Sequence, residues 1–330
     1  MSAESLRERI FTAADTEGFN ELALDIFRFQ YENCEVYREF ADALSRKPEN
    51  VKKLEGIPFI PVEFYKSREV ICSGMKPVRE FRSSGTSGSI PGRHLLADPL
   101  LYDSSLLKGF LYAYGDPARY TFLSLTPLPG ENPHSSLIYM IARLMQQNPV
   151  LRHGFFLKDA GGLRQQLSGP GFIPGKTILI GLTWALLDFG EKYPGDYPGL
   201  VVIETGGMKG KRKEITRAEL HQKLKQAFRG AAIHSEYGMT ELLSQAWSVQ
   251  EGVFRTPPWM KVMVREVNDP FCWCSPDRTG GISIVDLANL YSCSFIASQD
   301  LGRVNEDGSF EVLGRFDSSD LRGCSLMIQE

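Results

Sequence analysis

The sequence predicts an α/β protein with a helical opening segment and a β-rich closing segment. In the middle of the chain, short aliphatic and β-branched runs alternate with helical patterns, which is typical of a parallel sheet covered by crossover helices. These runs are residues 121–125, 177–182, 199–204 and 231–234. Helical spacing dominates before about residue 81, and strand patterns with tight turns dominate beyond about 255. We therefore expect three segments, 1–80, 81–254 and 255–330.

The opening segment, 1–80, reads as helices followed by a bounded apolar run. Leu6, Ile10, Leu22 and Phe27 lie among charged residues, and residues 57–64 (IPFIPVEF) are apolar and interrupted by prolines. We expect this segment to brace or cover the rest of the chain rather than to fold as a separate domain.

A first core helix is predicted after residue 132. Asn132 supplies a capping side chain and Pro133 a first-turn signal. Apolar residues then recur at intervals of three and four up to Met145. One face of this helix should therefore pack on the sheet.

A second core helix is predicted from Thr216. Thr216 and Glu219 have the spacing of a capping box, and Gly230 is expected to stop the helix. One apolar stripe should pack inward, formed by Leu220, Leu224 and Phe228. In the closing segment, Asp307-Gly308 between two β-rich runs predicts a hairpin.

Charge and composition exclude several kinds of partner. The chain has 37 Lys and Arg against 40 Asp and Glu, a net charge of −3 and a pI near 6.0. Nucleic acid and anionic membranes attract basic proteins, so no nucleic-acid partner is expected. No apolar run is long enough to span a bilayer and the opening is not a signal peptide, so we expect a cytoplasmic protein with no membrane span. The six cysteines should then be reduced thiols.

Two fragments have the composition of a nucleotide site. The run Ser83, Ser84, Gly85, Thr86, Ser87 and Gly88 carries hydroxyls and many accessible backbone N–H groups, which suits phosphate oxygens. It lacks the spacing and the Lys of a P-loop, and a flexible linker would have the same composition. The second fragment, 234–241 (HSEYGMTE), follows a short strand, where open α/β sheets bind ligands. An ordinary β-to-α turn is the alternative.

A third fragment completes a set of motifs that occurs in one enzyme superfamily. Residues 298–303 (SQDLGR), then Asp307-Gly308 and 314–317 (GRFD), have the order and spacing of the closing motifs of adenylate-forming enzymes. Over residues 81–328 the chain resembles this superfamily of acyl-CoA synthetases, firefly luciferase and peptide-synthetase adenylation domains. The resemblance implies their large-domain fold, with 81–254 as the ATP- and acyl-binding core. It also implies two steps: ATP and a carboxylate form an acyl-adenylate, and a thiol then takes the acyl group.

The resemblance also implies roles for single residues. Residues 83–88 would hold the pyrophosphate end of ATP, and the remaining positions would bind adenine, ribose, phosphate and Mg²⁺. Gly206, Gly207, Tyr237 and Gly238 would line the adenine pocket, Thr240 would bond a phosphate, Glu241 would ligate Mg²⁺, Asp300 would accept the ribose hydroxyls, and Arg315 would reach the ribose or phosphate. His134 falls where relatives place a residue beside the acyl group, although a lone His is more often structural.

Two departures from the family pattern stand out. The Lys that usually ends the phosphate loop has no match, and Arg93 is the nearest replacement. The sequence also ends soon after Asp317, the junction at which relatives continue into a mobile domain with a catalytic Lys. The fold expected is therefore the large domain without that mobile domain.

The end of the sequence resembles acyl-protein synthetases of the LuxE type, the fatty-acid-activating component of the bacterial luciferase fatty-acid reductase. So do 30–40 (QYENCEVYREF) and 57–67 (IPFIPVEFYKS). That family carries the acyl group on a cysteine near its C-terminus, which Cys324 matches, and passes it to an acyl-CoA reductase-like (LuxC-type) partner. A thiolate is a strong nucleophile, and Arg322 would lower its pKa. The resemblance implies a fatty or other hydrophobic acid, and leaves open whether homo- or hetero-oligomers form.

Other interpretations compete with this one. In the first alternative, Cys324 has no chemical role and packs as a small apolar residue. A ligase that passes the acyl group from acyl-AMP to CoA or a carrier protein would use the same site without Cys324. A degenerate nucleotide-binding scaffold for a reductase would retain the site without turnover. Zinc held by Cys272, Cys274, Cys293 and Cys324 is disfavoured, because the spacing is not CxxC and no His falls in that stretch.

Overall fold

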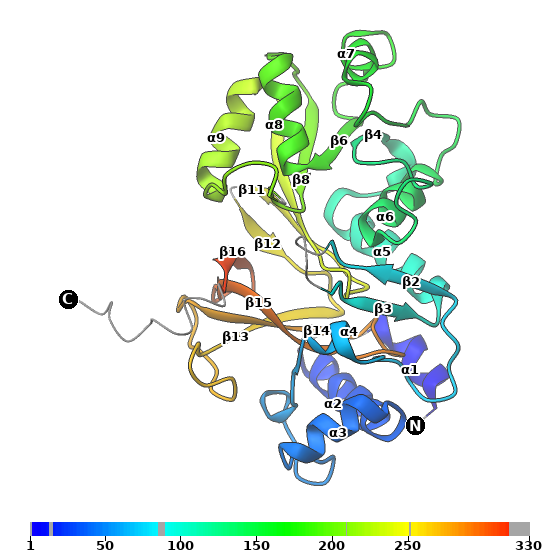
Figure 1. The fold of residues 1–330 in the computed structure, drawn as a ribbon, viewed down its shortest axis with the longest axis vertical. Helices are drawn as coiled ribbons and strands as arrows, with labels where there is room; N and C mark the ends of the chain where they lie inside the picture. Colours follow the sequence, from blue (N-terminus) through cyan, green and yellow to red (C-terminus); the bar gives the residue numbers. More distant parts are fainter. Residues whose placement is uncertain (1, 13–15, 85–89, 209, 251, 317–330) are drawn as a thin grey trace, which may run out of the picture.

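The computed structural model joins the middle and closing segments in one twisted sheet (Figure 1). It describes residues 2–12, 16–84, 90–208, 210–250 and 252–316. Among these residues the sheet has twelve strands, with the order β13-β14-β15-β16-β12-β11-β10-β8-β6-β4-β5 and β1 paired to β15. One half of the sheet is parallel and consists of β10, β8, β6, β4 and β5. In the other half, neighbours along the order β10-β11-β12-β16-β15-β14-β13 pair antiparallel.

The opening segment is helical and lies against the antiparallel half of the sheet (Figure 1). Gln30 of the second helix donates to the carbonyl oxygens of Asn289 and Leu290, at 3.0 and 2.9 Å, and thereby fixes the loop between β14 and β15. The elements of this segment are α1 (Ala3–Ile10), α2 (Thr16–Asn33), α3 (Glu35–Ala43), η1 (Leu54–Gly56), β1 (Ile60–Pro61) and α4 (Phe64–Ser67). The segment thus packs on the sheet and contributes β1 to it.

The middle segment alternates strands and helices as predicted. Its elements are β2 (Arg79–Arg82), β3 (Arg93–Leu96), α5 (Pro99–Tyr114), η2 (Pro117–Arg119), β4 (Thr121–Leu125), α6 (Ser136–Met145), β5 (Gly154–Phe155), α7 (Ala160–Ser168), β6 (Thr177–Leu182), α8 (Thr183–Lys192), β7 (Gly195–Asp196), β8 (Leu200–Thr205), α9 (Arg217–Ala227), β9 (Phe228–Arg229) and β10 (Ala232–Tyr237). The predicted runs 121–125 and 177–182 coincide with β4 and β6.

The closing segment is made of strands. They are β13 (Met260–Arg265), β14 (Gly280–Asp286), β15 (Phe295–Val304) and β16 (Phe310–Arg315), and they follow β11 (Ala246–Gln250) and β12 (Val253–Arg255) at the end of the middle segment. The hairpin predicted at Asp307-Gly308 joins β15 to β16, and Gly308 has a φ of 79°, a left-handed conformation that favours glycine. These strands continue the sheet of the middle segment, because β12 pairs with β16.

Two helix boundaries differ from the prediction. Helix α6 starts at Ser136, and its cap is Ser135, whose Oγ accepts from the N–H of Ile138 at 3.3 Å. The Asn132-Pro133 pair lies in the preceding turn, where Asn132 accepts from the N–H of Ser135 at 3.2 Å. Helix α9 starts at the predicted cap Thr216 but ends at Ala227, so Gly230 terminates the short strand β9 instead.

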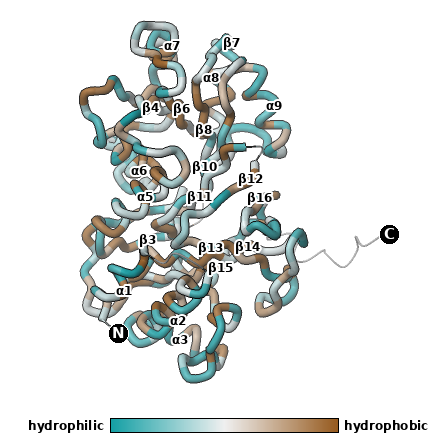
Figure 2. Tube along the Cα trace, turned by 180° about the vertical axis from the view of Figure 1, so that it is seen from behind, coloured by the Kyte–Doolittle hydropathy of each residue, from teal (hydrophilic) through white to brown (hydrophobic). Residues whose placement is uncertain are grey.

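Two apolar clusters flank the sheet. One combines α1 to α3, α5 and α6 with the antiparallel strands and with one face of β4, β6 and β8, and the other lies between the opposite face of these parallel strands and α7 to α9. Figure 2 shows hydrophobic residues along β6 and β8, which helices cover. A sheet covered on both faces is accessible to ligands chiefly at the ends of its strands. No helix in the described ranges is both long enough and apolar enough to cross a bilayer.

Candidate active site

Two of the predicted motifs lie at the carboxyl ends of parallel strands. Strand β8 ends at Thr205, directly before Gly206 and Gly207, and β10 ends at Tyr237. Both strands point the same way, so these segments meet at one edge of the sheet. Gly206 and Gly207 have φ angles of 76° and 62°, and Gly207 has open space where a side chain would lie. Backbone handedness therefore favours glycine at Gly207, and no neighbouring group excludes a side chain there.

Tyr237, Asp300 and Arg315 form one hydrogen-bonded cluster. The hydroxyl of Tyr237 donates to Oδ2 of Asp300 at 2.7 Å, and Nε of Arg315 donates to Oδ1 at 3.1 Å. The β15–β16 hairpin sets this contact, because Asp300 and Arg315 are register partners. The tyrosine ring packs edge-on against Phe254 and Phe310.

Burial and the neighbouring carboxylate of Asp300 raise the pKa of Tyr237 well above its usual value. The phenol therefore stays protonated and donates. Each oxygen of the Asp300 carboxylate keeps a second lone pair, so it still has capacity to accept hydroxyl groups of a ligand. Tyr237 is only 8% exposed, and its hydroxyl is directed to Asp300.

Glu241 meets the base of the predicted phosphate loop. A Cβ added to Gly92 would lie 2.5 Å from Oε1 of Glu241 and 3.3 Å from Oγ of Ser83, so only glycine allows this approach. The Oγ of Ser83 accepts from the N–H of Gly92 at 2.7 Å. Thr240 is half-buried beside Glu241, and Gly238 is exposed. The β10 motif and the ends of the loop are therefore in contact.

Glu241 is 5% exposed, and burial raises the pKa of its carboxyl group to about 7. Arg315 and Lys66 oppose that rise through their positive charges. A bound divalent cation would favour the ionised form further. The oxygen atoms of Glu241, Ser83 and Thr240 suit Mg²⁺, which is usually held by one or two carboxylates together with substrate phosphates and water. The described ranges hold no group of three or more His, Cys, Asp or Glu residues arranged for a metal ion.

The predicted phosphate loop starts from the β2–β3 hairpin, in which Arg82 and Arg93 are register partners. Ser84 is exposed, while Gly85, Thr86, Ser87 and Gly88 lie outside the described residues. The guanidinium of Arg93 is 3.3 Å from carboxylate oxygens of both Glu80 and Glu69. Its charge is therefore engaged by two carboxylates at the base of the hairpin.

His134 supports the same hairpin. Its Nδ1 is 3.0 Å from the carbonyl oxygen of Glu80, and its own carbonyl accepts from the N–H of Arg82 at 2.9 Å. These contacts tie the loop before α6 to β2. They place His134 beside the entry to the phosphate loop but give it no contact with Tyr237, Asp300 or Glu241.

The five cysteines in the described part of the chain all have raised pKa values. Burial raises those of Cys34, Cys72, Cys274 and Cys293, and a hydrogen bond to Asp269 raises that of Cys272. A raised pKa disfavours the nucleophilic thiolate. Cys324 lies outside the described residues.

Sequence reasoning missed several buried polar residues around the site. His94 and Asn289 contact the carbonyls of Thr240 and Glu241, and Asp286 binds the backbone that follows Glu241. Burial lowers the pKa of His94 to about 4, against its contacts with the carbonyl of Thr240 and with Asn289, which favour the protonated ring. The available signal was a polar residue within an apolar run, as in 285–296 (VDLANLYSCSFI).

Comparison with solved structures identifies the architecture. The 2-hydroxyisobutyryl-CoA ligase in complex with 2-HIB-AMP and CoA matches with a TM-score of 0.68 over 96% of this chain and 72% of that chain, at 13% identity. ATP-bound MatB from Rhodopseudomonas palustris matches with a TM-score of 0.53 over 72% of this chain, at 18% identity. The chain has the fold of the adenylate-forming enzymes. This confirms the fold class predicted from the motifs.

One curated relative agrees with the finer resemblance. A long-chain-fatty-acid–luciferin-component ligase of Photorhabdus luminescens is 32% identical over 69 residues, which is 21% of this chain. The chain covers 59% of that relative and 47% of MatB, about half the length of each. No family model matches the chain.

Proposed function

We propose that this chain activates a carboxylic acid with ATP as an acyl-adenylate. The observation that carries the proposal is the joining of Tyr237, Asp300 and Arg315 in one cluster, within a fold shared with adenylate-forming enzymes. Glu241, against Ser83 and Gly92, supplies the adjacent anionic group. A carboxylate with free lone pairs beside a cationic guanidinium suits a ribose diol and a phosphate.

In the proposed first step an oxygen of the substrate carboxylate attacks the α-phosphorus of ATP. The bond from that phosphorus to the bridging oxygen breaks, and pyrophosphate leaves. Mg²⁺, held by Glu241, would supply charge neutralisation for the phosphates. Asp300 would fix the ribose, and Arg315 and the hydroxyl of Thr240 would bind phosphate oxygens, so that the reacting atoms are aligned.

ATP–pyrophosphate exchange with a panel of acids tests this step. The panel should include fatty acids of eight to sixteen carbons, short hydroxy acids and aromatic acids. We expect exchange that depends on both the acid and Mg²⁺. Absence of exchange with every acid, while ATP still binds, would favour a nucleotide-binding scaffold over an enzyme.

We further propose that the acyl group passes to Cys324 and then to an acyl reductase partner. The thiolate attacks the acyl carbon, AMP leaves, and the thiol proton goes to solvent. Support comes from the fatty-acid ligase relative and from the raised pKa values of the five described cysteines, which make them poor nucleophiles. The acid would then be fatty.

Replacing Cys324 by serine should remove a covalent acyl adduct without affecting the first step. Intact-mass measurement with ATP and fatty acid is expected to show an adduct in the wild type that hydroxylamine releases and that Cys324→Ser lacks. Pyrophosphate exchange should stay within about twofold in the variant, because the serine leaves the adenylation site unchanged. Cys272→Ser, which removes an exposed thiol, is the control and should retain the adduct.

The second candidate function is direct transfer to CoA. The 2-hydroxyisobutyryl-CoA ligase, which matches 96% of this chain, favours it. Adding CoA discriminates the two, because a CoA ligase would release acyl-CoA at the same rate in wild type and Cys324→Ser.

Replacing Glu241 by glutamine should weaken metal-dependent activity without unfolding the protein. The amide keeps the shape of the carboxyl but loses its charge, so the rate of ATP–pyrophosphate exchange should fall at least about 100-fold. The raised pKa means that the ionised form costs stability above pH 7, so the melting temperature at pH 8 should not fall. Mn²⁺ binding followed by electron paramagnetic resonance measures the expected loss of metal affinity directly. Glu219→Gln, on an exposed face of α9, should change neither quantity.

A further inference from the structure

Behind Thr240 and Glu241, two buried side chains bind both carbonyl oxygens of this dipeptide. Nδ1 of His94, in β3, lies 2.8 Å from the carbonyl oxygen of Thr240, and Nε2 lies 3.1 Å from Oδ1 of Asn289. Nδ2 of Asn289 donates to the carbonyl oxygens of Glu241 and Cys293, each at 2.8 Å. Both side chains are 1% exposed.

The partners determine how these groups are oriented. A carbonyl oxygen only accepts, so the two contacts of Nδ2 fix the amide orientation of Asn289. For the same reason Nδ1 of His94 carries a proton and donates to Thr240, and Nε2 donates to Oδ1 of Asn289 only when the ring carries a second proton. A buried carbonyl that loses its donor is costly, so each contact opposes movement of the dipeptide.

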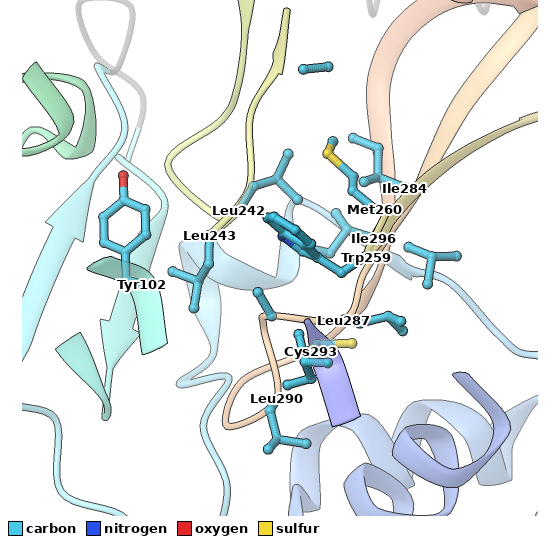
Figure 3. Packing of buried hydrophobic residues seen from close by; sticks show 14 of the residues in the cluster. Tyr102, Leu242, Leu243, Trp259, Met260, Ile284, Leu287, Leu290, Cys293 and Ile296 are labelled. Atoms are coloured by element: carbon cyan, nitrogen blue, oxygen red, sulfur yellow. The ribbon is translucent and has the colours of Figure 1, made fainter. Parts of the chain in front are cut away.

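The loop that carries Asn289 is itself immobilised. Gln30 donates to the carbonyl oxygen of Asn289 at 3.0 Å, and the N–H of Asn289 donates to the carbonyl of Asp286 at 3.0 Å. Leu242 and Leu243, directly after Glu241, lie in the same apolar cluster as Leu287 and Leu290 of that loop (Figure 3). The dipeptide is therefore held from β3 on one side and from the β14–β15 loop on the other.

We propose that His94 and Asn289 are positioning residues, which hold Thr240 and Glu241 by their backbone so that the hydroxyl and the carboxylate are presented to the nucleotide and its metal ion. The hairpin with β3 also carries Ser83 and Gly92 of the phosphate loop, so His94 couples that loop to the β10 motif. The identity of the ligand rests on the proposed function, whereas the restraint on the dipeptide does not.

The test compares His94→Ala and Asn289→Ala with a matched control. Ser292→Ala removes two buried hydrogen bonds of the same β14–β15 loop, to the carbonyl of Val70 at 2.7 Å and to the hydroxyl of Tyr65 at 3.1 Å, and neither involves Thr240 or Glu241. Melting temperature, amide hydrogen exchange of residues 239–244 and calorimetric titration with ATP in Mg²⁺ buffer are measured for all three. His94→Gln, which keeps one N–H donor, is the conservative variant.

We expect both alanine variants to speed exchange in 239–244 by about tenfold and to weaken Mg·ATP binding by a similar factor. Ser292→Ala should lower the melting temperature to the same extent with neither change, and His94→Gln should restore part of both. The proposal would be overturned if all three alanine variants had the same rate of amide hydrogen exchange in residues 239–244 and the same affinity for Mg·ATP. If the wild type binds no ATP, the proposed function fails, and the hydrogen-exchange comparison still decides whether these residues restrain the dipeptide.

Discussion

Replacing Asp300 by alanine is expected to abolish measurable nucleotide binding, with a loss of at least about 100-fold in affinity. A carboxylate that accepts from two ribose hydroxyls makes two charge-assisted hydrogen bonds of about 1.5–3 kcal/mol each, and about 1.4 kcal/mol is a factor of ten. The same change removes the partner of Tyr237 and Arg315. Calorimetric titration with ATP and with AMP measures the loss, and pyrophosphate exchange should fall in parallel.

The controls for Asp300 separate binding from folding. Glu311→Gln removes a carboxylate of the same hairpin, whose partner Arg303 is 2.8 Å away near the surface, and should leave affinity unchanged. Asp300→Asn keeps the shape but not the charge and should show an intermediate loss. The Asp300→Ala variant should stay folded, although the buried hydroxyl of Tyr237 loses its acceptor at a cost of about 1–3 kcal/mol. A folded Asp300→Ala protein that binds ATP within threefold of wild type would contradict the assignment of the site.

Strands β4, β6 and β8 of the parallel half could be predicted almost to the residue. Strands β4 and β6 are buried along their whole length, so they appear as continuous apolar runs bounded by turn residues. The cap of α6 could not be predicted in the same way. Asn132 and Ser135 are both good caps, and the choice of Ser135 depends on a turn from Leu128 to Asn132 that has no distinct sequence pattern.

Pairings between distant segments were beyond the sequence. The contact of β12 with β16 joins Val253 to Glu311, and it attaches strands β13 to β16 to the rest of the sheet. Neither strand carries a signal that identifies its partner, because the alternation of side chains fixes a face but not a neighbour.

The residues of the candidate site also differ in whether the sequence reveals them. Tyr237, Asp300 and Arg315 could be singled out as candidates because their motifs have a characteristic order in the chain. His94 and Asn289 were missed because they bind backbone carbonyls 146 and 48 residues away, and a backbone carbonyl has no residue identity to match. Residues that orient a site through the backbone therefore leave little trace in a single sequence.

The largest loss of stability is expected from replacing Asp286 by alanine. This carboxylate ends β14, is fully buried and accepts from the N–H groups of Leu243, Ser244 and Ala288 and from the hydroxyl of Ser244. Alanine leaves these donors without an acceptor, at about 1–3 kcal/mol each. The sum, at least about 4 kcal/mol, is a large part of the 5–15 kcal/mol that stabilises a typical domain. Urea unfolding followed by circular dichroism measures it.

The pH dependence of that stability separates the charge of Asp286 from its hydrogen bonds. Burial raises the pKa of Asp286 to about 6 against its four donors. The folded state thus retains a proton that the unfolded chain releases above about pH 4, so the contribution of Asp286 is greatest at pH 4 and declines as pH rises to about 6. Asp286→Asn, which cannot titrate, should therefore cost about 2 kcal/mol more at pH 4 than at pH 7. A cost that is instead larger at pH 7 would show that the four donors outweigh burial and that the carboxylate is ionised throughout.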